Sequence, residues 1–106
     1  MTATPAAPGI VWADPLRRQA FERWFEPVAK HHGLLAPSLR AASSDASFRR
    51  YFRVDSGAGA AHIVMDAPPP LEDVRPFVEI ASRLARAGLN APRIVEQDAA
   101  NGFLLL

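Results

Sequence analysis

The sequence predicts an α+β fold whose elements follow the order α-β-β-β-α-β-β. Three observations support this fold class. An apolar stripe with helical spacing lies near the N-terminus, an alternating strand is followed by a glycine-containing turn and a second strand, and another helical stripe begins near Pro76. We expect a disordered lead-in over residues 1–13, a helix over 14–33, and a unit over 38–106 that contains the strands.

The first helix has clear boundary signals. Asp14 suits the N-cap, and Pro15 suits the first helical position, where its missing N–H loses no hydrogen bond. Gly33 can adopt the left-handed conformation that ends a helix, and Pro27 is expected to kink or shorten this one. The apolar stripe consists of Leu16, Ala20, Phe21, Trp24, Phe25 and Val28.

The strand pattern begins after Ser38. Phe48, Phe52 and Val54 are expected on one face of a strand, with Arg50 interrupting them, while Arg49, Tyr51 and Arg53 are expected on the other face. A turn over residues 56–59 leads to a returning strand over 62–66, and the prolines at 68–70 are expected to form an extended connector.

The second helix is located by Pro76, because proline is tolerated in the first turn of a helix. Asp73 is therefore the expected N-cap and Val74 the first helical residue, while Gly88 ends the helix. A strand over 93–96, a turn over 98–102 and a strand over 103–106 complete the order.

Composition limits the function classes. The chain has 106 residues and a formal net charge of +1, which gives no electrostatic case for a nucleic-acid or membrane partner. With no cysteine, disulfides, thiolate nucleophiles and cysteine-ligated zinc are excluded. The N-terminus lacks the features of a secretory signal, and no apolar run approaches the roughly 18 residues of a membrane helix, so we expect a cytoplasmic protein.

A small polar loop is the first candidate site. Close approach of backbone amides and hydroxyl donors suits an anion such as a phosphate, although an ordinary turn between two strands explains the same residues. The loop residues are Ser43, Ser44, Asp45, Ala46 and Ser47.

Three further features have structural explanations beside functional ones. The strand that interleaves arginines with aromatics can contact nucleic acid, but core packing of the aromatics, with arginines solvated or paired to carboxylates, explains it better. Asp66 can hold a metal or a hydroxyl, or form a turn. His31, His32 and His62 show no metal-ligand spacing, because adjacent helical histidines are expected to face apart and lack acidic neighbours, so no metal ligand is predicted.

Five segments together resemble the N-terminal lobe of the aminoglycoside phosphotransferase-like kinases, most closely the bacterial anomeric N-acetylmuramate/N-acetylglucosamine kinases. They cover most of residues 38–106 in the family's order and spacing. The segments are DASFRRYFR (45–53), VMDAPP (64–69), EDVRPF (72–77), AGLNAP (87–92) and GFLLL (102–106).

The resemblance implies a protein-kinase-like N-lobe, a five-stranded antiparallel sheet with one packed helix and a preceding N-terminal helix. ATP would lie beneath the sheet, with the polar loop over its phosphates and the last strand near its adenine. The cofactor-binding residues so implied are Ser43, Ser44, Asp45, Ala46, Ser47, Phe48, Ile63, Met65 and Leu105.

Two departures from the family pattern stand out. No lysine lies near Met65, so the usual lysine–glutamate pair cannot form there; an arginine among Arg49, Arg50 and Arg53 can substitute. Its carboxylate partner stays open between Glu72, Asp73 and Glu79. The family's catalytic loop and Mg²⁺ ligands are expected beyond residue 106, in a C-terminal lobe, so we expect this chain alone to be inactive.

The leading hypothesis is thus the ATP-binding N-terminal part of an amino-sugar kinase that serves cell-wall recycling, with ATP, Mg²⁺, a sugar and its own C-terminal lobe as partners. Two alternatives stay open. One is a non-catalytic α+β module that binds an anionic ligand or nucleic acid. The other is a nucleotide-binding pseudokinase, which the missing lysine permits.

Overall fold

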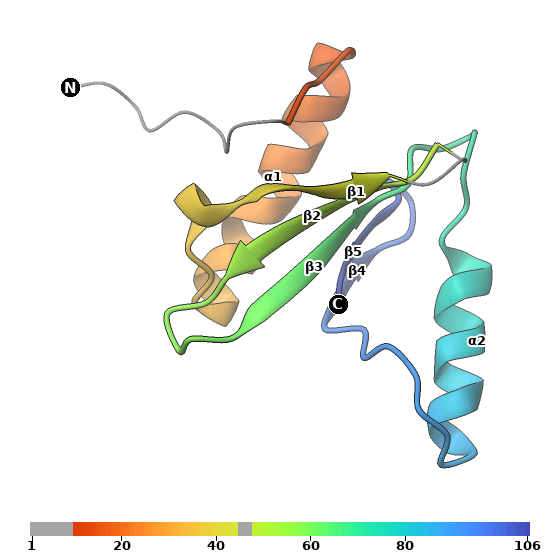
Figure 1. Cartoon of the computed structure of the whole chain (residues 1–106). Helices are drawn as coiled ribbons and strands as arrows, with labels where there is room; N and C mark the ends of the chain where they lie inside the picture. Colours follow the sequence, from red (N-terminus) through yellow and green to blue (C-terminus); the bar gives the residue numbers. More distant parts are fainter. Residues whose placement is uncertain (1–9, 45–47) are drawn as a thin grey trace.

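The computed structural model describes residues 10–44 and 48–106, and it confirms the α+β class (Figure 1). Two helices and a short 3₁₀ turn accompany five strands in the predicted order. The elements are α1 (Pro15–His32), η1 (Ala36–Ser38), β1 (Arg40–Ser44), β2 (Arg50–Asp55), β3 (Ala61–Asp66), α2 (Arg75–Arg86), β4 (Glu96–Asp98) and β5 (Phe103–Leu105).

The strands form one antiparallel sheet in the order β1-β2-β3-β5-β4, which confirms the five-stranded sheet that the family resemblance implied. Tyr51 on β2 lies opposite Met65 on β3, and Met65 lies opposite Leu104 on β5. A register shift between Ala41 and Ser43 marks a bulge in β1. This register decides which side chains share a face of the sheet.

The predicted boundaries of α1 are confirmed. The Asp14 carboxylate accepts a hydrogen bond from the Leu16 N–H at 2.9 Å, and Gly33 ends the helix with φ of 65°. Pro27 lies inside the helix without shortening it.

Leu16 does not belong to the buried stripe as expected, since it is 71% exposed. At 100° per residue Leu16 lies roughly 140° around the helix from the buried Phe21 and roughly 180° from the buried Phe25, because an i+4 series drifts around the helix. Arg17 falls on the inner side instead.

The helices cover opposite faces of the sheet, which we name the α1 face and the α2 face (Figure 1). On the α1 face, Phe21 of the helix contacts Phe52 and Phe103 edge-to-face at 5.7 and 5.4 Å between ring centroids. Trp12, which the sequence placed in a disordered lead-in, also packs on Phe21 and Phe52; residues 1–9 of that lead-in lie outside the described part. On the α2 face, Met65 and Leu104 pack with Val74 and Phe77.

The second half of the chain departs from several expected boundaries. Helix α2 begins at Arg75, with Val74 rather than Asp73 at its N-cap position. The Asp73 side chain nevertheless accepts a hydrogen bond from the Arg75 N–H at 3.0 Å, as a capping carboxylate does. The connector at 68–70 turns instead of extending: the Glu72 N–H donates to the Pro68 carbonyl, and the Pro69–Pro70 bond is cis.

The strand expected at residues 93–96 lies at Glu96–Asp98, where its pairing with β5 is fixed by the turn that follows. In that turn Gly102 has φ of 76°, and a Cβ added there would lie 1.9 Å from the Ala67 carbonyl oxygen. Only glycine fits this position, so the β4–β5 turn is held close against the end of β3.

Candidate functional site

The α2 face is the candidate functional surface, because only part of it is covered. Met65 and Leu104 are almost completely buried next to α2. Arg53 and Ser43, which the register places on the same face, are exposed, and Ile63 is half-buried. The face is therefore closed at α2 and open over β1, β2 and the first half of β3.

The predicted site residues divide between the two faces. Ser43, Ile63 and Met65 share the α2 face, although the Met65 side chain is enclosed by the core. Leu105 lies on the α1 face, where it is fully buried with Phe52 and Val64.

The residue beside Ile63 is Leu106 and not the predicted Leu105. The Leu106 N–H donates to the Ile63 carbonyl at 2.7 Å. Strand alternation was the signal in the sequence that could have selected Leu106 in place of Leu105.

The polar loop connects the ends of β1 and β2, and it opens at the same end of the sheet as Asp66 and Phe103. Phe48, at its C-terminal side, is 59% exposed rather than packed on the strand face with Phe52 as expected, because β2 begins only at Arg50. Asp45, Ala46 and Ser47 lie outside the described residues.

An arginine is held at the base of this loop. The Arg49 Nε donates to the Glu72 Oε1 at 2.8 Å, and the two side chains are 28% and 14% exposed. Burial opposes the charge on the guanidinium, but hydrogen bonds to Glu72 and Tyr51 outweigh it and raise the pKa of Arg49. The guanidinium thus stays charged and is fixed in direction next to Tyr51, the register partner of Met65.

Among the candidate arginines and carboxylates, the structure pairs Arg49 with Glu72. The Asp73 carboxylate accepts from the Arg75 N–H at the start of α2, and Glu79 pairs with Arg83 at 2.8 Å on the exposed side of the helix. Of the three candidate carboxylates, only Glu72 meets an arginine of the loop–strand segment. Sequence reasoning could not choose it, because the partners are 23 residues apart and no periodicity links them.

Arg50 is engaged on the opposite face. Its Nη2 lies 2.9 Å from the Asp66 Oδ2, and Arg17 of α1 reaches the Asp66 Oδ1 at 2.6 Å. The two guanidinium groups also stack over Trp12 and Phe103. Asp66, expected to form a turn or hold a ligand, is a buried acceptor that joins α1 to the sheet.

This arrangement also bears on the arginine–aromatic strand. Core packing is confirmed for Phe52, which is 1% exposed, and pairing with carboxylates is confirmed for Arg49 and Arg50. Tyr51 is half-buried and Arg53 is exposed.

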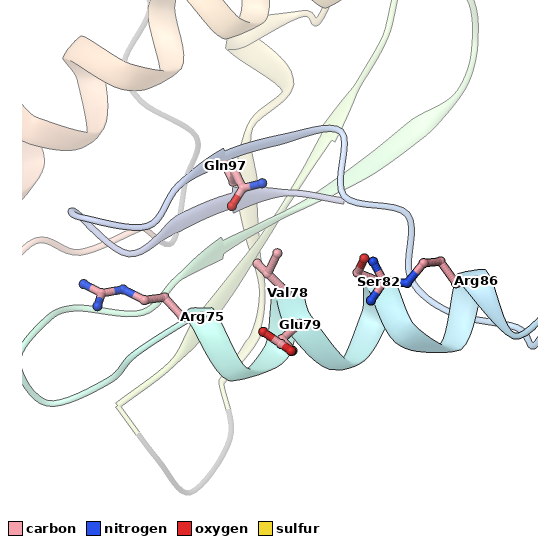
Figure 2. A pocket seen from close by; sticks show the side chains of 6 residues that line it. All are labelled: Arg75, Val78, Glu79, Ser82, Arg86 and Gln97. Atoms are coloured by element: carbon pink, nitrogen blue, oxygen red, sulfur yellow. The ribbon is translucent and has the colours of Figure 1, made fainter.

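A separate open cavity of about 440 Å³ lies between α2 and β4 (Figure 2). Its lining mixes positive and negative charges with one apolar side chain. The lining residues are Arg75, Val78, Glu79, Ser82, Arg86 and Gln97. Within the described residues, neither helix has the length and apolar character needed to cross a bilayer.

Comparison with known proteins places this fold. Residues 38–106 match the model of the phosphotransferase enzyme family, which is most of the chain. The chain belongs to the phosphotransferase enzyme family. This confirms the resemblance stated from the sequence and identifies the sheet with α2 as the kinase-like N-lobe of that family.

Three curated relatives within this family carry the same name. The N-acetylmuramate/N-acetylglucosamine kinase of Pseudomonas aeruginosa is 50% identical over 101 residues, which cover 89% of this chain and 30% of the relative. The enzyme of the same name from Pseudomonas putida is 61% identical over 71 residues, or 67% of this chain and 21% of the relative. That of Neisseria meningitidis is 30% identical over 90 residues, or 85% and 25%. The chain thus spans less than a third of the length of these phosphotransferase relatives.

Proposed function

We propose that this chain is the ATP-binding N-terminal part of a kinase that transfers the γ-phosphoryl group of ATP to a hydroxyl of an amino sugar. The observation that carries the proposal is the fixed Arg49 guanidinium at the base of the loop, beside the open part of the α2 face. N-acetylmuramate and N-acetylglucosamine are the proposed acceptors, because the relatives carry both names. The proposed setting is cell-wall recycling in the cytoplasm.

Arg49 supplies the charge that a lysine on β3 supplies in related kinases. A guanidinium donates in a planar fork that matches phosphate oxygens, and Glu72 holds it in one direction. Glu72 thereby acts as a positioning residue. Met65, at the strand position where the lysine was expected, is apolar and buried, so it contributes only to the core.

The remainder of the nucleotide fits the open face. Backbone amides and hydroxyls of the loop that includes Ser43 would cover the phosphates. Ile63 and Leu106 offer apolar surface at the other end of the face, where an adenine ring can pack. Leu105 enters only through its backbone, since its side chain lies on the α1 face.

Mg²⁺ does not fit Asp66 or Glu72, the two carboxylates described near the loop end of the sheet. Asp66 accepts hydrogen bonds from two arginines, and Glu72 accepts one from Arg49. We therefore assign Mg²⁺ binding and the base that activates the sugar hydroxyl to the C-terminal lobe.

Nucleotide titration tests the binding proposal. Calorimetry with ATP is expected to show one site in the full-length gene product, and Arg49→Ala is expected to weaken binding by about 10-fold or more, as loss of a charge-assisted hydrogen bond does. Arg18→Ala is the matched control, because Arg18 is an exposed arginine on α1, which packs on the opposite face of the sheet. Equal affinity in the wild-type protein and the Arg49→Ala variant would remove Arg49 from the site.

A phosphorylation assay tests the reaction. The full-length product is expected to phosphorylate N-acetylmuramate or N-acetylglucosamine with ATP and Mg²⁺. A nucleotide-binding pseudokinase is the second candidate, and the absence of a lysine near Met65 favours it. ATP binding without phosphorylation of any sugar in a panel would select that alternative.

A further inference from the structure

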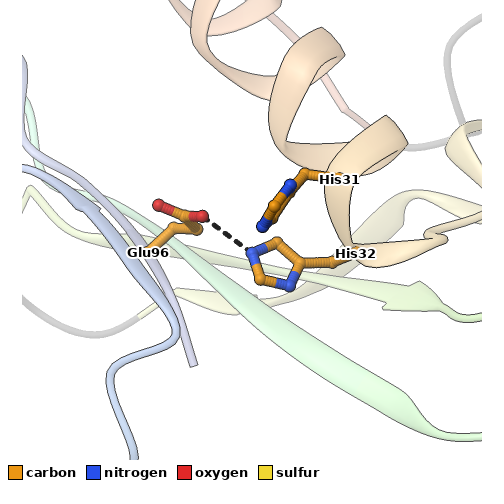
Figure 3. Close-up of side chains that lie close together, drawn as sticks. All are labelled: His31, His32 and Glu96. Carbon is orange, nitrogen blue, oxygen red and sulfur yellow. Dashed lines mark hydrogen bonds and ion pairs between the residues drawn. The ribbon is translucent and has the colours of Figure 1, made fainter.

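The C-terminal end of α1 and the start of β4 bring three possible metal ligands together (Figure 3). His31 and His32 are the last residues of α1, and Glu96 is the first of β4. The His32 Nε2 lies 2.7 Å from the Glu96 Oε2, and the two imidazole rings meet edge-to-face with centroids 4.7 Å apart. One donor atom from each residue lies within 4.8 Å of the others.

The fold produces this cluster, contrary to the expectation that the histidines face apart without acidic neighbours. Glu96 lies opposite Leu105 in the sheet register, and Leu105 is buried beneath α1. Directly opposed side chains of an antiparallel pair share a face, so the Glu96 carboxylate lies on the α1 face. Gly33 ends α1 above this edge of the sheet, which leaves both imidazoles beside the carboxylate.

We propose that His31, His32 and Glu96 bind a divalent transition-metal ion, with Zn²⁺ the first candidate and water in the fourth position. Imidazole nitrogen and carboxylate oxygen are ligands that Zn²⁺ accepts, at about 2.0–2.2 Å. Ligands at that distance in a tetrahedron lie roughly 3.3 Å apart. To bind the ion, the donor atoms that lie up to 4.8 Å apart must move closer together, and the His32–Glu96 hydrogen bond must break. The side chains have room for both changes, because His31 is exposed and the Glu96 side chain is 35% exposed.

The electrostatic environment suits a cation. The C-terminal end of a helix carries partial negative charge from its unpaired carbonyl groups. Lys30, which precedes the two histidines on α1, pairs at 3.6 Å with Glu26 on the preceding turn, and both are largely exposed. A simple hydrogen bond between His32 and Glu96 is the competing explanation for the observed contact, and metal titration separates the two.

The metal would join the last turn of α1 to the edge strand β4. It lies on the α1 face, opposite the proposed nucleotide surface, so the inference does not depend on the proposed function. A bound ion would stabilise the folded chain, because the ligands come together only in the fold.

Calorimetric titration of the metal-free, untagged chain with ZnCl₂ tests the proposal. One site per chain is expected, with a rise in melting temperature, while MgCl₂ is expected to produce neither. Glu96→Gln keeps a hydrogen-bond acceptor for His32 but removes the charged ligand. It is expected to weaken Zn²⁺ binding at least as much as the roughly 10–100-fold lost with an outer-shell partner.

His32→Ala is the second variant, and His62→Gln is the matched control, since His62 is the remaining histidine and lies on β3. Circular dichroism of each variant establishes that it is folded. The proposal is overturned if the wild-type chain shows no heat and no thermal shift with Zn²⁺. It is also overturned if Glu96→Gln, His32→Ala and His62→Gln all bind Zn²⁺ as the wild type does.

Discussion

The two faces of the sheet differ in how far their apolar side chains are covered and in where their charged side chains are paired. On the α1 face, aromatic rings from α1, β2 and β5 are closed over by the helix, and Asp66 is neutralised by Arg17 and Arg50. On the α2 face, the core is confined to the side next to α2, and a charged guanidinium stands at the border of an open surface. In this sheet, packing on the α1 face contributes most of the stability of the fold, while part of the α2 face stays open to a ligand.

The largest effect is expected from the aromatic core of the α1 face. Phe52→Ala would remove a ring that contacts both Trp12 and Phe21, at a loss of about 4 kcal/mol in the free energy of unfolding. Urea denaturation measures this loss. Phe48→Ala is the matched control, because that ring is 59% exposed and its removal should change stability by less than about 0.5 kcal/mol. Similar losses in both variants would contradict the assignment of the core to Phe52.

The Asp66 carboxylate is expected to matter nearly as much. Asp66→Ala leaves two partly buried arginines without their acceptor, at a loss of about 3 kcal/mol in unfolding free energy. Asp66→Asn keeps an acceptor oxygen but not the charge, so a smaller loss is expected in the same denaturation experiment. If Asp66→Ala unfolds at the wild-type urea concentration, the network does not tie α1 to the sheet.

Gly102 lies in the β4–β5 turn, which packs against the end of β3 at Ala67. Gly102→Ala combines a positive φ with a clash against the Ala67 carbonyl, and a loss of about 2–3 kcal/mol is expected. Gly59→Ala is a strict comparison, since Gly59 also has a positive φ but no atom within 4 Å of an added Cβ. Thermal denaturation should show the smaller loss, about 1 kcal/mol, in Gly59→Ala. Equal losses would mean that the close approach at Gly102 does not constrain the turn.

The sequence predicts local features well and distant pairings poorly. The caps at Asp14 and Gly33 depend on neighbouring residues, and the structure confirms both. Strand β4 was misplaced because its position is set by hydrogen bonds with β5, not by its own three residues. Leu16 was assigned to the core because an apolar i+4 series does not define which side of the helix is buried.

The candidate site shows the same limit more strongly. The family resemblance named both Ile63 and Met65, and the two share a face of β3, yet burial of Met65 depends on α2, which packs from elsewhere in the chain. The Arg49–Glu72 and His32–Glu96 contacts join residues 23 and 64 positions apart. Such contacts follow from the stacking of whole elements, and no local pattern in one sequence encodes them.

The smallest stability effect, and the sharpest functional one, is expected at Arg49 and Glu72. Because their side chains are partly exposed, Glu72→Gln should lower the unfolding free energy by no more than about 1 kcal/mol. ATP affinity of the full-length protein should nevertheless fall, since the guanidinium would lose the carboxylate that fixes its direction. In a cycle of Arg49→Ala, Glu72→Gln and the double variant, Glu72→Gln should have no further effect on ATP affinity once Arg49 is gone. Additive losses in the double variant would show that Glu72 acts on the nucleotide by itself, and that Arg49 is not its route.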